Sequence, residues 1–206
     1  MKFNFFRHRS KLWSQAGFTL MEIIVALGIF SIASTASISV FIRSNLVQKR
    51  TANIQRVVSD ARYALEVMAR EVRMGSIDYS YSGYLSPLPF LQTQLALTDA
   101  DDQPLRFRRY EVATGRFAIQ VCYGLAVCGD TDWLDITPGD LTITRLDFYI
   151  SPAKNPFVWD DSVADYPNDQ QPRVTIVMES QSLNRDIGTP KISNFQTSVT
   201  SRKYVR

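Results

Sequence analysis

The hydrophobic pattern of the chain begins with an apolar run from Phe18 to Ile42. Seventeen of its 25 residues are apolar, and Glu22 is the only charged one. At the rise of an α-helix the run is about 37 Å long, whereas the hydrocarbon core of a bilayer is about 30 Å thick. The pattern predicts a membrane-spanning helix. Two alternatives remain: a buried core helix, for which the rest of the chain is small, and a secretory signal peptide, whose apolar region is usually shorter.

The same helix is predicted to continue beyond the apolar run and to end near Gly75, a residue typical of helix C-termini. Apolar residues recur there at spacings of three and four: Ile54, Val57, Val58, Ala61, Leu65, Met68 and Val72. This stripe predicts an amphipathic helix with one face on a protein core. The opposite face is charged, and we interpret it as a solvated face rather than a partner-binding surface. Its residues are Arg56, Asp60, Arg62, Glu66, Arg70 and Arg73.

After Gly75 the pattern changes to turns and short segments rich in β-branched and aromatic residues. We expect a loop at 76–89, a polar loop at 151–172, and no further helix. The fold class is therefore predicted as α+β, with the long N-terminal helix packed against an antiparallel β-sheet head. The expected strands are Leu105–Val112, Arg116–Tyr123, Thr142–Ile150, Arg173–Ser180 and Ile192–Thr200.

Charge is distributed unevenly over the chain, although the whole carries only +3. Residues 1–17 carry +4, residues 18–42 carry −1 and residues 43–75 carry +4. The remainder, 76–206, has twelve Lys and Arg against sixteen Asp and Glu, a net charge of −4. Because basic residues flank the apolar run on both sides, charge alone does not predict its orientation in a membrane.

The stretch "GFTLMEIIVALGIFSI", which starts at Gly17, resembles the processing signal of type IV pilins and type II secretion pseudopilins. It combines a basic leader, a glycine, an aromatic first mature residue and a glutamate at the fifth mature position. The resemblance implies that prepilin peptidase cleaves between Gly17 and Phe18, and that the new amine of Phe18 is then methylated. It also implies that the leader lies inside the cell and the body lies beyond the bacterial inner membrane.

This resemblance implies four segments. They are a leader peptide at 1–17, the transmembrane half of the helix at 18–42, its amphipathic half at 43–75, and a periplasmic β-rich head at 76–206. The stretch "ARYALEVMAREVRMGS" at 61–76 additionally resembles the stem of minor subunits, namely the J-type minor pseudopilin and the W-type minor pilin. Many major pilins have a proline in the membrane half of the helix, whereas this helix has none.

Glu22 is the residue to which the resemblance gives an assembly role. A carboxylate within a bilayer costs about 2.5–3.5 kcal/mol unless it is compensated. We expect Glu22 of one subunit to pair with the Phe18 amine of its neighbour, which would drive lateral docking and set the register of the packed helices. The alternative is that Glu22 only snorkels to the headgroups.

Cys122 and Cys128 bracket a predicted hairpin. If the body lies outside the cytoplasm, a disulfide is permitted, and we favour it over two free buried thiols. A zinc site is poorly supported because the chain has two cysteines and a single histidine, His8, which lies in the leader.

Without a histidine in the mature chain, Ser-His-Asp and Cys-His catalysis are excluded. We expect no enzyme activity, no cofactor, no metal and no small-molecule substrate. Two acidic clusters could bind Ca²⁺, but neither matches an EF-hand, and we interpret both as solvated loops. One comprises Asp99, Asp101 and Asp102, and the other Asp160, Asp161, Asp165 and Asp169.

The function predicted from these features is that of a minor pilin or pseudopilin. Its partners would be prepilin peptidase, other minor and major pilins or pseudopilins, and the lipid of the inner membrane. The alternative is a DNA-binding minor pilin, for which the stretch "RFRRY" at 106–110 would be the nucleic-acid patch. The negative head argues against this alternative, and Arg106 and Arg108 also suit the solvent face of an edge strand.

Overall fold

The structure is a computed structural model that describes residues 17–85, 88–159, 165–166, 170–183 and 192–203. The chain divides into two compact units, at 1–47 and 48–206, and helix α1 (Leu20–Met74) contributes to both. Most of the second acidic cluster (Asp160, Asp161, Asp165 and Asp169), interpreted above as a solvated loop, and residues 1–16 of the predicted leader lie outside the described residues.

In the first unit, α1 is exposed along nearly its whole length. Four of its hydroxyl groups donate to the carbonyl one turn earlier. The bonds are Ser31 to Leu27 (2.7 Å), Thr35 to Ser31 (2.8 Å), Ser37 to Ala33 (2.8 Å) and Ser39 to Thr35 (2.9 Å). A helix that satisfies its own polar groups in this way can enter hydrocarbon without exposing unpaired donors.

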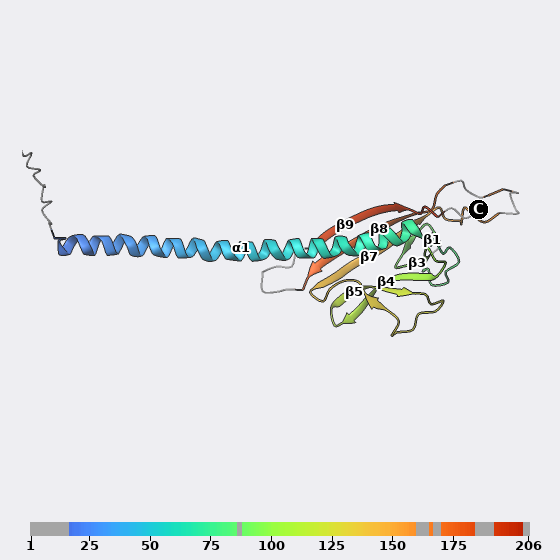
Figure 1. Ribbon diagram of the computed structural model, residues 1–206, viewed down its shortest axis with the longest axis horizontal. Coiled ribbons are helices and arrows are strands. Elements are labelled where there is room, and N and C mark those ends of the chain that lie inside the picture. Colours follow the sequence, from blue (N-terminus) through green and yellow to red (C-terminus); the bar gives the residue numbers. More distant parts are fainter. Residues whose placement is uncertain (1–16, 86–87, 160–164, 167–169, 184–191, 204–206) are drawn as a thin grey trace, which may run out of the picture. The chain divides into compact units, whose positions relative to one another are not determined.

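The second unit contains nine strands among the described residues, and they form two antiparallel sheets. Sheet A has the order β1-β3-β4-β5-β6, and its strands are Ser76–Ile77, Gln94–Thr98, Pro104–Ala113, Arg116–Tyr123 and Leu134–Asp135. Sheet B has the order β2-β7-β8-β9, and its strands are Leu91–Gln92, Leu141–Ser151, Arg173–Ser182 and Ile192–Thr200. Figure 1 shows β7, β8 and β9 beside the cyan and green part of α1.

The predicted α+β fold class is confirmed, and the five predicted strands correspond to β4, β5, β7, β8 and β9. The strands form two sheets rather than one, and four short strands were not predicted. One of these, β1, lies in the segment that we expected to be a loop. The helix begins at Leu20 rather than at Phe18 because Thr19 caps it, as described below.

One hydrophobic core joins α1 to both sheets within the second unit. The helix contributes Val57, Ala61, Ala64, Leu65, Met68, Ala69 and Val72, so most of the predicted stripe is buried. Ile54 is 39% exposed and lies outside the core, whereas Ala64 and Ala69 are buried although the stripe did not include them. Small alanines let the sheets approach the helix closely, and the fully buried Phe107 and Phe148 fill the space between them.

The C-terminal end of α1 is held by the last described residues of the chain. The Ser201 hydroxyl donates to the Gly75 carbonyl at 2.6 Å, and the Arg202 N–H donates to the Arg73 carbonyl at 3.0 Å. These bonds satisfy carbonyl groups that the helix itself leaves free. A Cβ atom at Gly75 would lie 2.3 Å from the carbonyl oxygen of Thr98, so only glycine fits between α1 and β3.

We therefore expect Gly75→Ala to lower the free energy of unfolding by about 1–3 kcal/mol, because the new methyl group must push β3 away from the helix. Denaturant unfolding of the purified protein in detergent measures this loss. Gly139→Ala is the matched control, since nothing lies within 4 Å of its added Cβ. Equal stability of the two variants would contradict the close approach at Gly75.

Candidate functional site

The N-terminal segment contains the residues that the sequence singled out for processing. Gly17, Phe18 and Thr19 have no regular secondary structure and precede α1, and the Phe18 side chain is 75% exposed. An exposed peptide bond outside regular secondary structure is accessible to a peptidase. Nothing lies within 4 Å of a Cβ added at Gly17, so the fold gives no steric reason for glycine there.

Thr19 is the N-cap of α1. Its hydroxyl accepts a hydrogen bond from the Glu22 N–H at 3.3 Å, and its carbonyl accepts one from the Ile23 N–H at 3.2 Å. Glu22 is consequently the third residue of the helix, where the helix dipole favours a negative charge. The pattern Thr-x-x-Glu before an apolar run is the sequence signal of this arrangement, although the capping role of Thr19 was not predicted.

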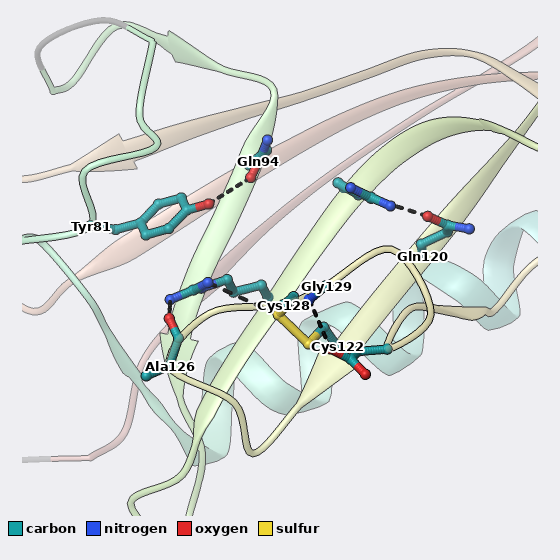
Figure 2. Close-up of a disulfide and its surroundings, with 10 residues drawn as sticks. Tyr81, Gln94, Gln120, Cys122, Ala126, Cys128 and Gly129 are labelled. Atoms are coloured by element: carbon teal, nitrogen blue, oxygen red, sulfur yellow. Dashed lines mark hydrogen bonds between the residues drawn. A yellow bond between two sulfur atoms is a disulfide. The ribbon is translucent and has the colours of Figure 1, made fainter.

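The two cysteines meet on the outer face of sheet A, the face opposite the hydrophobic core (Figure 2). Cys122 belongs to β5, Cys128 to the loop that follows, and the two form a disulfide with their Cα atoms 6.4 Å apart. The Arg106 guanidinium donates to the Ala126 carbonyl within the enclosed loop. A hydrogen bond of 2.7 Å from the Gly129 N–H to Asp132 orders the residues after it.

The "RFRRY" stretch lies in β4, which is an internal strand between β3 and β5, so the expectation of an edge strand is wrong. Arg106 lies over the Tyr81 ring, with 4.7 Å from its guanidinium carbon to the ring centroid. Arg109 points to the opposite side, where its Nε donates to the Ile143 carbonyl at 2.6 Å and its guanidinium lies over Phe117. Arg106 and Arg109 thus make internal contacts that fix the head's own structure.

The first acidic cluster forms the turn between β3 and β4. The Asp99 carboxylate accepts hydrogen bonds from the N–H groups of Asp101 (2.9 Å) and Gln103 (2.8 Å). Asp102 adopts a φ of 60° and forms an ion pair with Lys203. The described residues contain no group of three His, Cys, Asp or Glu side chains suited to a metal ion. Within this turn the carboxylates serve to shape the hairpin.

The chain matches the family model described as "Prokaryotic N-terminal methylation motif" over residues 14–38. Comparison with curated proteins and with solved structures finds no match. The matched residues include Gly17, Phe18 and Thr19, which directly precede α1, and Glu22 in its first turn. The match confirms the predicted resemblance to type IV pilins and pseudopilins, a family of structural subunits that are generally not enzymes.

One described helix, α1, is long and apolar enough to cross a membrane, with a mean hydropathy of 2.1 over its most apolar window. Together with the methylation motif, it indicates a membrane-anchored, single-pass protein. The motif also implies processing by prepilin peptidase and assembly with other pilins.

Proposed function

Since the chain is a type IV pilin-like precursor, we propose that it is a minor pilin or pseudopilin. In this role it joins other subunits in the tip or initiation complex of a periplasmic filament, for type II secretion or type IV pilus biogenesis. The observation that carries the proposal is the methylation motif. The motif leads directly into an exposed apolar helix, and the C-terminal part of the same helix is buried against the head.

Two features of the chain support a minor rather than a major subunit. Helix α1 contains no proline from Leu20 to Met74, whereas many major pilins have one in the membrane half. The segment at 61–76 resembles the stems of J-type and W-type minor subunits. It supplies most of the helix residues that are buried against the two sheets, so this resemblance covers the part of the stem that contacts the head.

We place the leader at 1–17, the membrane-spanning part at 18–42, the amphipathic part at 43–75 and the head at 76–206. The head lies in the periplasm and α1 is anchored in the inner membrane. The disulfide between Cys122 and Cys128 supports this orientation, because disulfides persist in oxidising compartments. The role is structural, with prepilin peptidase and partner subunits acting on the N-terminal segment, and without a cofactor or small-molecule substrate.

At the N-terminus, Gly17 and Phe18 flank the cleaved bond, and Phe18 carries the methylated amine. Glu22 pairs with the Phe18 amine of a neighbouring subunit and sets the register of packed helices. The structure supports this role by its geometry alone: Glu22 is in the first turn, one turn from the end of the helix where the new amine forms. A charge there is favoured by the dipole and accessible to a neighbour.

Deleting the gene tests the function. We expect few filaments or little secretion in the deletion strain, restored by the wild-type chain, because an initiating subunit is needed once for each filament. Quantitative immunoblotting of sheared filaments should find far fewer copies of this chain than of the major subunit. A copy number close to that of the major subunit would contradict a minor role, and undiminished filament assembly would contradict initiation.

A further inference from the structure

Arg108 occupies an unusual environment on the outer face of sheet A. Its guanidinium carbon lies 3.8 Å from the centroid of the Trp133 ring and 4.2 Å from that of Tyr110. Its Nε donates to Gln120 Oε1 at 3.0 Å, a bond drawn as the dashed line to Gln120 in Figure 2. Two rings and one amide therefore fix the plane of the guanidinium.

No carboxylate neutralises this cation among the described residues. The nearest acid along the cross-strand row, Asp135, is engaged by Gln120 Nε2 at 2.9 Å and by Arg116 at 3.5 Å. Burial lowers the pKa of Arg108. The phenols of Tyr110 and Tyr81, which are anionic only at high pH, and the carboxylate of Asp130 oppose that change without forming an ion pair with it. In the described part of the chain, Arg108 makes this single hydrogen bond through Nε, which leaves its two terminal nitrogens available.

A partly desolvated arginine without a counterion is costly for a folded protein. The same arrangement is well suited to binding, because the planar fork is already oriented and has lost its freedom before a ligand arrives. A carboxylate is the group whose two oxygens match the fork. Arginine, tryptophan and tyrosine are also the residues that contribute most to binding at protein interfaces.

An apolar loop is hydrogen-bonded to Arg106, the neighbour of Arg108 on the same face of β4. Arg106, two residues earlier on the same face of β4, is opposite Cys122, and it donates to Ala126 in the loop closed by the disulfide (Figure 2). At the tip of this loop Val127 is 82% exposed and Leu125 is 40% exposed. The loop is thus held by a covalent and a hydrogen bond while it presents apolar side chains to solvent.

We propose that Arg108 and the loop at 124–128 form a docking surface for a protein partner that presents a carboxylate flanked by apolar side chains. The carboxylate takes the fork of Arg108, and its apolar neighbours cover Leu125 and Val127. A protein fits better than a nucleic acid for two reasons. The faces of Tyr81, Tyr110 and Trp133 that are nearest the arginines are already covered by guanidinium groups, and the head from 76 to 206 has a net charge of −4.

Panning a random peptide library on the full-length protein in detergent tests the proposal. We expect the selected peptides to share an Asp or Glu between apolar residues. Exchanging that acid for its amide in a selected peptide should weaken binding about tenfold or more, because a charge-assisted bidentate bond is lost. This comparison needs no change in the protein.

Protein variants then locate the site. Arg108→Lys keeps the charge but loses the fork and the stacking, so it should weaken binding to a similar degree, and Val127→Ser should weaken binding through the exposed tip. Arg70→Lys, at an exposed arginine on α1, is the control and should bind normally. Near-ultraviolet circular dichroism spectra that match that of the native protein show that each variant is folded.

Three results would overturn the proposal. They are selection of peptides without a shared carboxylate, unchanged binding to both Arg108→Lys and Val127→Ser, and stronger binding of a single-stranded DNA oligonucleotide than of the selected peptides. The last result would instead assign the surface to nucleic acid and favour a DNA-binding minor pilin.

Discussion

Gly17→Val is expected to leave residues 1–17 attached to nearly every copy of the chain, whereas we expect the native protein to begin at a methylated Phe18. We expect this result because the substitution impairs recognition by prepilin peptidase and not the folding of the chain. The space around Gly17 is open, so the added side chain meets nothing in the protein, and the backbone there precedes the first turn of α1. A bulkier residue beside the cleaved bond therefore changes only what the peptidase must accommodate.

Mass spectrometry of the N-terminal peptide measures both cleavage and methylation. Gly28→Val is the matched control: it adds the same side chain at a second glycine with open surroundings, but within the helix and away from the cleaved bond. The control should be processed normally and begin at methylated Phe18. Cleavage of the native chain near Ala36 would instead identify the segment as a secretory signal peptide and exclude the pilin interpretation.

The parts of the fold that could be predicted from the sequence are those in which a hydrophobic pattern repeats over many residues. Strand β8 alternates between buried and more exposed residues from Arg173 to Ser182, and the stem buries one residue in every three or four. Strands β1, β2 and β6 have two residues each, too few for any period. Strand β3 has three consecutive buried residues, because Tyr84 covers its outer face through a hydrogen bond to Ala96.

The functional residues likewise comprise some that short sequence patterns predict and others that only the fold brings together. Gly17, Phe18, Glu22 and the two cysteines follow from short patterns in the sequence, and Thr19 could have been recognised from its spacing to Glu22. The environment of Arg108 could not be predicted from the sequence, because Trp133 contacts it from a loop beyond β5 and Asp135 forms an ion pair with Arg116. Only the pairing of β4 with β5 and β6 brings these residues together.

The second large effect is expected from Glu22→Gln, which should abolish assembly with partner subunits while insertion and leader cleavage stay near normal. Glutamine has the size of glutamate and serves equally at the third position of a Thr-x-x-Glu cap, so the start of α1 is preserved. What is lost is the charge. If Glu22 compensates the Phe18 amine of a neighbour, its removal leaves that cation unmatched at the edge of the lipid.

The snorkelling interpretation predicts the opposite result, because a neutral amide is easier to hold near lipid than a carboxylate, and the change should then be nearly silent. Crosslinking of the full-length subunit to co-expressed partner pilins in membranes separates the two. Glu22→Asp keeps the charge on a shorter side chain and should assemble in part.

Thr19→Ala completes the comparison, because it removes the capping hydroxyl, at a cost of about 1 kcal/mol to the helix, and leaves the carboxylate in place. We expect this variant to crosslink nearly as well as the native chain. Undiminished crosslinking of Glu22→Gln would refute charge pairing. Equal losses in Glu22→Gln and Thr19→Ala would instead show that the structure of the first helical turn, and not the charge of Glu22, drives the docking of one helix on the next.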